Sequence, residues 1–153
     1  MQWIQKNFEQ LTTAELYLIL KLRCEVFVVE QNCPYNDLDD HDRHPSAIHL
    51  FTLKNDALCG YLRILPAGCC YPNMPSFGRV VTAKSARGTG VGRALVSRAN
   101  QIMDENWPQS TCHISAQAYL EHFYQQHGFH VVGEPYLEDG IPHIGMERLL
   151  NRS

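Results

Sequence analysis

The sequence predicts a single domain of mixed helices and strands, of class α/β (α+β), with a mixed central sheet flanked by helices. Its 153 residues suit a single domain covering residues 1–153, and a chain of this size can bury a core without a metal or disulfide. Helical and strand-like patterns of apolar residues alternate in the order β-α-β-β-β-α-β-α-β-β. A glycine-rich turn at residues 87–92 stands between one of the predicted strands and a helix.

The first part of the chain predicts a long helix and then a polar loop. Thr12 and Glu15 have the spacing of a capping box, and they predict a helix over residues 13–30. Its apolar residues recur at helical spacing, with Arg23 in the same stripe. Residues 34–45 are polar and rich in aspartate, and we interpret them as a surface loop with one short helical turn.

The remaining elements are predicted from runs of apolar residues and from the residues that interrupt them. Pro108 ends one helix, and Gly128 is placed to end another as a left-handed cap. Two runs joined by Lys54-Asn55-Asp56 predict a hairpin. The predicted strands are residues 48–53, 58–65, 77–82, 111–116, 129–133 and 144–150, and the predicted helices are residues 91–107 and 119–127.

Composition and charge exclude several classes of protein. The formal net charge of −3 argues against a general nucleic-acid binder, and no apolar run approaches the roughly 20 residues that span a bilayer. The six cysteines include no C-x-x-C pair, and the first ten residues lack a signal peptide's apolar core. We therefore expect a cytoplasmic protein with reduced thiols and with no nucleic-acid or membrane partner. An exposed sheet edge makes a homodimer plausible.

The glycine-rich turn reads Arg87-Gly88-Thr89-Gly90-Val91-Gly92. Glycines allow backbone N–H groups to converge at a helix N-terminus, which favours a phosphate or pyrophosphate. Two common phosphate loops are excluded, because Arg93 stands where a dinucleotide fingerprint needs glycine and where a Walker loop needs lysine. Bare glycines would also suit a flexible turn, but the flanking arginines favour an anion site.

The spacing Arg-x-x-Gly-x-Gly resembles the coenzyme A pyrophosphate loop of the GNAT acetyltransferase superfamily. Further along, Phe123-Tyr124 and Gly128-Phe129 fit that family's Phe-Tyr-(x)3-Gly-Phe pattern, while Gln117 replaces its usual asparagine. The segments Arg23 to Tyr35 and Glu138 to Met146 resemble the ElaA-like acetyltransferases, a group of small bacterial proteins.

This resemblance implies the GNAT acyl-CoA N-acyltransferase fold, with acetyl-CoA as co-substrate and no metal. It implies that backbone groups of Val80, Val81 and Thr82 pair with the pantetheine arm, and that one N–H polarises the thioester carbonyl. The residues expected to bind the cofactor are Val80, Val81, Thr82, Arg87, Gly88, Gly90, Val91, Gly92, Arg93, Gln117 and Tyr124.

Tyr124 is the expected general acid. A phenol with a pKa near 10 stays protonated at neutral pH and can give its proton to a departing thiolate. Without the family spacing, Phe123 and Tyr124 would be interpreted as packing aromatics of a short helix.

The general base is left open among three residues. The strand before the Tyr124 helix carries Cys112 and His113 but no carboxylate, so no base follows from the family pattern. Each substitute also has an alternative role in packing or in lining the acceptor pocket. These substitutes are Glu30, His49 and His143.

Two clusters along the sequence invite a binding role. The acidic run Asp37, Asp39, Asp40 and Asp42 suits a cationic amine, although a solvated loop is the interpretation we favour. His41, His44 and His49 with Cys33 match no closed zinc pattern, so we expect no metal.

The implied reaction is direct transfer of an acetyl group from acetyl-CoA to a primary amine, in a ternary complex. The acceptor is a small molecule, a peptide or a protein, and the sequence does not choose among them. One alternative is a non-catalytic acyl-CoA-binding module. Another is an acyltransferase like the acyl-homoserine-lactone synthases, suggested by the brief match Arg23-(x)3-Phe27-Val28.

Overall fold

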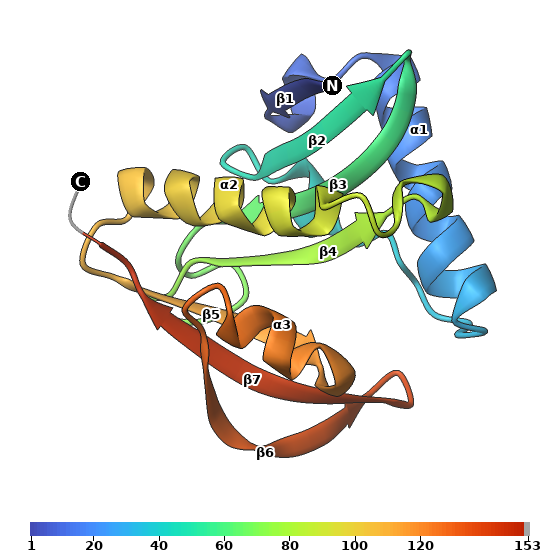
Figure 1. The fold of residues 1–153 in the computed structure, drawn as a ribbon. Helices are drawn as coiled ribbons and strands as arrows, with labels where there is room; N and C mark the ends of the chain where they lie inside the picture. The colour runs from blue at the N-terminus through green and yellow to red at the C-terminus, as the bar shows by residue number, and fades with distance from the viewer. Residues whose placement is uncertain (152–153) are drawn as a thin grey trace.

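The computed structural model describes residues 1–151, which form two antiparallel sheets and three α-helices (Figure 1). The predicted fold class and order of elements are confirmed, but in place of one mixed sheet the strands form two sheets in which every pairing is antiparallel. One sheet has the order β1 (Gln2–Lys6), β2 (Ile48–Lys54), β3 (Ala57–Leu65) and β4 (Ser76–Thr82), and the other has the order β5 (Thr111–Gln117), β7 (Ile141–Leu149) and β6 (His130–Glu138).

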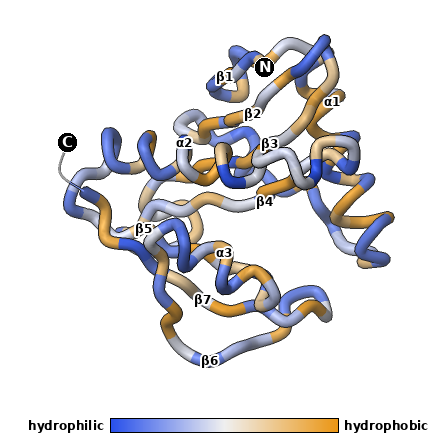
Figure 2. Tube along the Cα trace, viewed as in Figure 1, coloured by the Kyte–Doolittle hydropathy of each residue, from blue (hydrophilic) through white to orange (hydrophobic). Residues whose placement is uncertain are grey.

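The first helix, α1 (Thr13–Arg23), begins as predicted and then changes pitch. Thr12 N–H donates to Glu15 Oε1 at 2.9 Å, and Glu15 N–H donates to Thr12 Oγ1 at 3.0 Å, so the capping box is formed. Residues Cys24–Glu30 continue it as a π-helical segment, η2. Figure 2 shows apolar and polar stretches along α1, whose buried residues Ile19, Leu22 and Arg23 lie three or four positions apart or side by side near its C-terminal end.

Helix α2 (Val91–Asn106) lies across the first sheet, where it contacts β2, β3 and β4. Its apolar face includes Val91, Leu95 and Met103, all buried in the main core. Gly60 of β3 makes this packing possible, because a Cβ there would lie 2.7 Å from Val91 Cγ1 and 2.8 Å from Leu95 Cδ1. The absent side chain therefore sets how closely the start of α2 approaches the sheet.

Helix α3 (Glu121–Gln125) follows a short 3-10 turn, η5 (Ala118–Leu120). Gly128 has φ +90°, and Phe129 N–H donates to Tyr124 O at 3.1 Å, so the predicted left-handed cap is formed. This tight ending turns the chain into β6 and packs Tyr124 and Phe129 against Phe77 of β4, with ring centroids 6.3 and 5.7 Å from that of Phe77.

The two sheets meet at one end of β4 and β5 and then separate (Figure 1). His113 N–H donates to Pro75 O at 3.1 Å, and among residues 1–151 this is the only backbone hydrogen bond between those two edges. Beyond it β4 contains a bulge. Tyr61 pairs with Val81 and Arg63 pairs with Gly78, so β4 uses three residues where β3 uses two. Arg79 supplies the extra residue at φ +52°. The bulge bends β4 away and leaves facing strand edges unpaired.

Across the described chain, no helix has the length and apolar character needed to span a membrane.

Candidate active site

A cavity of about 930 Å³ lies between the separated edges of β4 and β5. Every residue of β4 lines it, together with Ile114 to Gln117 of β5. Tyr124 of α3 and Glu30 of η2 also line it, as does Arg87 of the glycine-rich turn. The separation of the sheets thus brings together residues that are far apart in the sequence.

The glycine-rich turn presents free backbone amides beside this cavity. Gly88 and Gly90 have φ values of +79° and +90°, which favour glycine. The first helical hydrogen bond of α2 runs from Ala94 N–H to Gly90 O at 3.0 Å, so the amides before Ala94 lack helical partners. Gly92 lines the cavity with Arg87, while Gly88, Gly90, Val91 and Arg93 belong to the adjoining turn and first helical residues. This arrangement suits an anion.

Arg87 is already paired with a carboxylate from η2. Its two terminal nitrogens lie 2.9 Å from the two oxygens of Glu30. The bond and charge of Arg87 hold the pKa of Glu30 below its usual range, and Glu30 raises the pKa of Arg87. Glu30 therefore lies at the cavity as an ion-pair partner of the turn, and its lowered pKa makes it a weaker base.

The β4 edge and Gln117 form the middle of the cavity wall. Val80, Val81 and Thr82 all line the cavity, and the side chain of Val81 is also buried in the cluster beneath α1. At the end of β5, the side-chain amides of Gln117 and Gln31 face each other. Each Nε2 lies 3.4 Å from the Oε1 of the other residue. The residues expected to contact a pantetheine arm thus lie together along one wall.

Tyr124 is buried within aromatic neighbours, and only 5% of it is exposed. Its ring centroid lies 5.1 Å from that of Phe123 and 6.1 Å from that of Phe129. Burial raises the pKa of its phenol well above the ordinary value, so the hydroxyl stays protonated. Within residues 1–151 this hydroxyl has no hydrogen-bond partner, although the residue lines the cavity.

Of the two histidines considered as bases, the structure brings one to the cavity. His143 lines it, with Nδ1 2.7 Å from Ile141 O and Nε2 3.4 Å from Glu138 Oε2. His49 does not line it and is 1% exposed. Its ring nitrogens lie 2.8 Å from Tyr61 Oη and 3.0 Å from Asp42 O. Burial lowers the pKa of His49, which is consistent with a neutral packing residue.

The interpretation of the acidic run as a solvated loop is wrong for Asp37 and Asp42, which are 5% and 6% exposed. Buried Arg23 donates to Asp37 Oδ2 at 2.8 Å and to the two carboxylate oxygens of Asp42 at 2.7 and 3.1 Å. Charged side chains can be buried here because each has an opposite partner.

Two further arginines complete this buried network. Arg63 Nη1 donates to Asp39 Oδ1 at 2.6 Å and to Asp42 Oδ1 at 2.9 Å. Arg79 Nη2 donates to Asp37 O at 2.9 Å and to Asp39 Oδ2 at 3.4 Å. Three arginines thus face three aspartates, and the charges balance. Asp40 is separate, since it pairs at the surface with Arg43 at 2.9 Å. The run has little negative charge left to attract a cationic amine.

Sequence reasoning missed this network, although a signal was present. Arg23 interrupts an apolar helix stripe, and Arg63 stands between Leu62 and Ile64 in an apolar strand. An arginine in such a position needs a buried acid, and the only dense acidic run in the chain supplies it.

Comparison with known proteins assigns the chain. A family model described as an acetyltransferase (GNAT) domain matches residues 21–150. The chain belongs to the GNAT acetyltransferase family. It is an ElaA-like acyltransferase, 43% identical to the protein ElaA of Escherichia coli over 148 residues, which cover 97% of this chain and 96% of ElaA.

Solved structures agree with this GNAT assignment. The crystal structure of E. coli ElaA superposes with a TM-score of 0.90 at 42% identity, covering 97% of this chain and 99% of that one. An acyl-CoA N-acyltransferase from Pseudomonas aeruginosa gives a TM-score of 0.89, also at 42% identity and with the same coverage. A CoA-dependent acyl-homoserine lactone synthase, BjaI, gives 0.77 at 16% identity, covering 98% of this chain and 82% of that one. That last likeness shows a shared fold alone.

Proposed function

We propose that this GNAT protein transfers an acetyl group from acetyl-CoA to a primary amine in a ternary complex. One observation carries the proposal: the glycine-rich turn at Arg87, the unpaired edge of β4 and buried Tyr124 all border one cavity. An acyl-CoA needs these three features, since its pyrophosphate requires converging amides, its pantetheine amides require a strand edge, and its thiolate requires an acid.

The cofactor would lie along the turn and the strand. The free amides of residues 90–93 and the Arg87 guanidinium would hold the pyrophosphate. The pantetheine arm would pair with the edge of Val80 to Thr82, in the manner of an added strand. One of those N–H groups would donate to the thioester oxygen and stabilise the negative charge that develops there.

In the transfer itself, the amine nitrogen attacks the thioester carbon. The new C–N bond forms as the C–S bond breaks, and the departing thiolate takes the proton of the Tyr124 hydroxyl. The amine gives up one proton to a base, and one proton returns to Tyr124 from solvent. Because burial keeps the phenol protonated, Tyr124 is available as the acid throughout the neutral range.

We assign the proton acceptor to His143 in preference to Glu30 and His49. Its Nδ1 lies at hydrogen-bond distance from a carbonyl, which can only accept, so Nδ1 carries the proton of the neutral ring. Nε2 is then free to accept a proton, directly or through a water molecule. The nearby Glu138 carboxylate would stabilise the charged ring that results.

Replacing Tyr124 with Phe tests the acid role. The exchange keeps the ring and removes the hydroxyl, so we expect kcat to fall by about 10²-fold or more with little change in the Kd of acetyl-CoA. Tyr17→Phe, at an exposed position of α1, is the control. Unchanged turnover in Tyr124→Phe would remove the residue from the mechanism.

The cofactor is tested separately by thermal unfolding. Acetyl-CoA should raise the melting temperature more than NAD or ATP at equal concentration, because binding to the folded state stabilises it by mass action. Stabilisation by NAD or ATP alone would contradict the proposed cofactor. If acetyl-CoA binds but no thiol is released with a broad panel of amines, the non-catalytic binding module would be favoured instead.

A further inference from the structure

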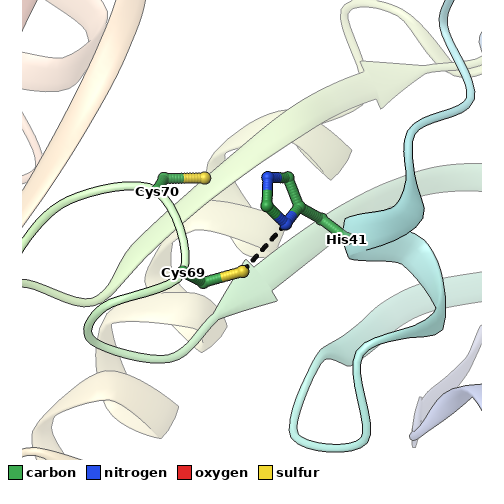
Figure 3. A group of neighbouring side chains, drawn as sticks. All are labelled: His41, Cys69 and Cys70. Carbon is green, nitrogen blue, oxygen red and sulfur yellow. Dashed lines mark hydrogen bonds between the residues drawn. The ribbon is translucent and has the colours of Figure 1, made fainter.

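Two neighbouring cysteines and a histidine converge at one end of the cavity, outside the proposed acetyl-transfer machinery. His41 lies in a 3-10 turn, η3 (Asp40–Arg43), and Cys69 and Cys70 lie in the loop between β3 and β4. His41 Nδ1 is 3.0 Å from Cys69 Sγ, and the three potential ligand atoms all lie within 4.8 Å of one another. In Figure 3 both thiols point toward the imidazole.

We propose that His41, Cys69 and Cys70 form a zinc site. Two thiolates and one imidazole are ligands that zinc prefers, and the two thiolate charges balance the ion. Zinc lies about 2.3 Å from sulfur and about 2.0–2.1 Å from nitrogen, so its tetrahedral ligands are about 3.5–3.8 Å apart. His41 Nδ1 and Cys69 Sγ are 3.0 Å apart, and the other two pairs of ligand atoms are separated by at most 4.8 Å. Small rotations about the side-chain bonds would adjust the three atoms to that spacing.

The backbone on both sides of the cluster is held in place. Asp42, next to His41, is buried and accepts hydrogen bonds from Arg23 and Arg63. In the cysteine loop, Cys69 N–H donates to Pro66 O at 3.2 Å. These bonds keep the three ligands near one another before an ion arrives, which reduces the entropy lost on binding.

The other thiols and histidines are arranged differently. All six cysteines are free thiols, but Cys33 Sγ donates to Asp139 O at 3.3 Å and Cys59 Sγ to Ala57 O at 3.6 Å. His44 Nδ1 accepts from Ser46 N–H at 3.0 Å. The expected absence of a metal rested on His41, His44, His49 and Cys33, and these do not come together. The adjacent pair Cys69-Cys70, which that expectation did not include, supplies two of the three ligands proposed here.

The site would have an open coordination position toward the cavity. His41 and Cys70 both line the cavity, at the end of β4 where Leu65 pairs with Ser76. The glycine-rich turn follows the other end of β4. Since β4 has seven residues and a strand rises about 3.3 Å per residue, its two ends are about 20 Å apart. Three protein ligands leave the fourth tetrahedral position for water or for a donor atom of a molecule in the cavity. The metal site itself does not depend on the proposed acetyl transfer.

Cobalt titration of the reduced, metal-free protein tests the site without measuring turnover. We expect one equivalent of Co²⁺ to bind with a thiolate-to-cobalt charge-transfer band and the d–d bands of a four-coordinate ion. One equivalent of Zn²⁺ should remove both. Azide should shift the d–d bands, because the fourth position is open; unchanged bands would contradict that opening.

Matched variants assign the ligands. Each of three variants should lose the charge-transfer band and bind zinc at least about 100-fold more weakly: Cys69→Ser, Cys70→Ser and His41→Ala. Replacing even a residue that only hydrogen-bonds to a metal ligand typically lowers metal affinity by about 10–100-fold. Cys24→Ser, an exposed thiol, and His44→Ala should retain one equivalent. Circular dichroism and thermal unfolding would establish that each variant is folded. The proposal is overturned if the wild-type protein, with both thiols shown to be reduced, binds no ion, or if folded ligand variants keep full affinity.

Discussion

At the scale of single residues, the charged network around Arg23 is the largest departure from an apolar core. Arg23 is fully buried and makes four hydrogen bonds to Asp37 and Asp42. Such a network need not stabilise the fold more than apolar packing would, but removing one partner leaves the opposite charge buried and unpaired. Its value here is positional, because it fixes residues 37–42 against the cavity wall.

Asp42→Asn measures that dependence. The amide cannot neutralise Arg23 and Arg63, so we expect the free energy of unfolding to fall by about 3–5 kcal/mol in urea denaturation. Asp40→Asn is the matched control, since its carboxylate is 93% exposed and, among residues 1–151, its ion pair is with Arg43. That variant should change stability by less than about 1 kcal/mol. Equal effects at the two positions would argue against a buried network.

At the scale of elements, η2 and the glycine-rich turn are joined through Glu30 and Arg87. A pyrophosphate bound at the turn would compete with Glu30 for the same guanidinium. Glu30→Gln should therefore tighten acetyl-CoA binding, by about two- to fivefold as for an exposed ion pair, and retain most of the turnover. Isothermal titration and steady-state kinetics separate the two effects.

Glu25→Gln is the control for this change, because Glu25 lies in the same π-helical segment and pairs with Lys21 at 3.9 Å, away from the turn. If Glu30→Gln loses turnover while the Kd of acetyl-CoA is unchanged, Glu30 and not His143 is the proton acceptor.

The elements were predictable where local spacing determines them. The capping box at Thr12 and the periodicity of α2 depend on neighbours three or four residues away, and the structure confirms both. The change of pitch after Arg23 and the bulge at Arg79 depend on contacts with distant residues, so no local pattern marks them. The last hairpin was predicted too short, with strands over residues 129–133 and 144–150. In the structure β6 continues to Glu138 through an irregularity in its pairing between Val132 and Tyr136.

The same distinction applies to the site. The glycine-rich turn and Tyr124 were recognisable because their motifs are contiguous or closely spaced. The Asp37 to Asp42 segment was misjudged, since its partners Arg23, Arg63 and Arg79 are brought to it only by the fold. His49 was a reasonable base by residue type, but its burial beside Tyr61 follows from sheet register.

At the scale of the whole molecule, stability should fall in two stages as the pH is lowered. Burial lowers the pKa of His49, so the folded state resists a proton that the unfolded state accepts near pH 6.5. Burial alone would raise the pKa of Asp42, but Arg23 and Arg63 outweigh burial and hold that pKa below its usual range. The pKa of Asp39 is also lowered, by Arg63 and Arg79 against the opposing effect of burial. These carboxylates therefore stabilise the fold above about pH 4, and that stability is lost as the pH falls through their folded-state values.

Urea denaturation at pH 8, 5 and 3 would resolve the two stages. Each group contributes at most about 1.4 kcal/mol per pH unit within its own interval. Burial also lowers the pKa of His127, so His49→Gln should reduce the decline between pH 8 and 5 without abolishing it, and should leave the acidic decline. The control is His44→Gln, because His44 is partly exposed and lies five residues before His49. This variant should leave both stages of the decline in place. A single transition that His49→Gln does not alter would contradict this assignment.

The division into two sheets gives the cofactor a second effect, on the dynamics of the whole molecule. Between β4 and β5, the described chain has the single backbone bond from His113 to Pro75, so the facing edges can move apart more readily than paired strands. An acyl-CoA seated between them would bridge the sheets. At 100 times its Kd it would stabilise the fold by about 2.7 kcal/mol.

Hydrogen exchange would show where that stabilisation acts. With saturating acetyl-CoA, we expect amide protection to rise most in residues 78–82 and 114–117, which line the cavity, and in the adjoining turn at residues 87–93, because these amides exchange through local opening. The β2–β3 turn at residues 54–57 should exchange as before. Arg87→Ala should reduce the protection in proportion to its loss of affinity. Protection confined to segments away from the cavity would contradict a cofactor that binds between the sheets.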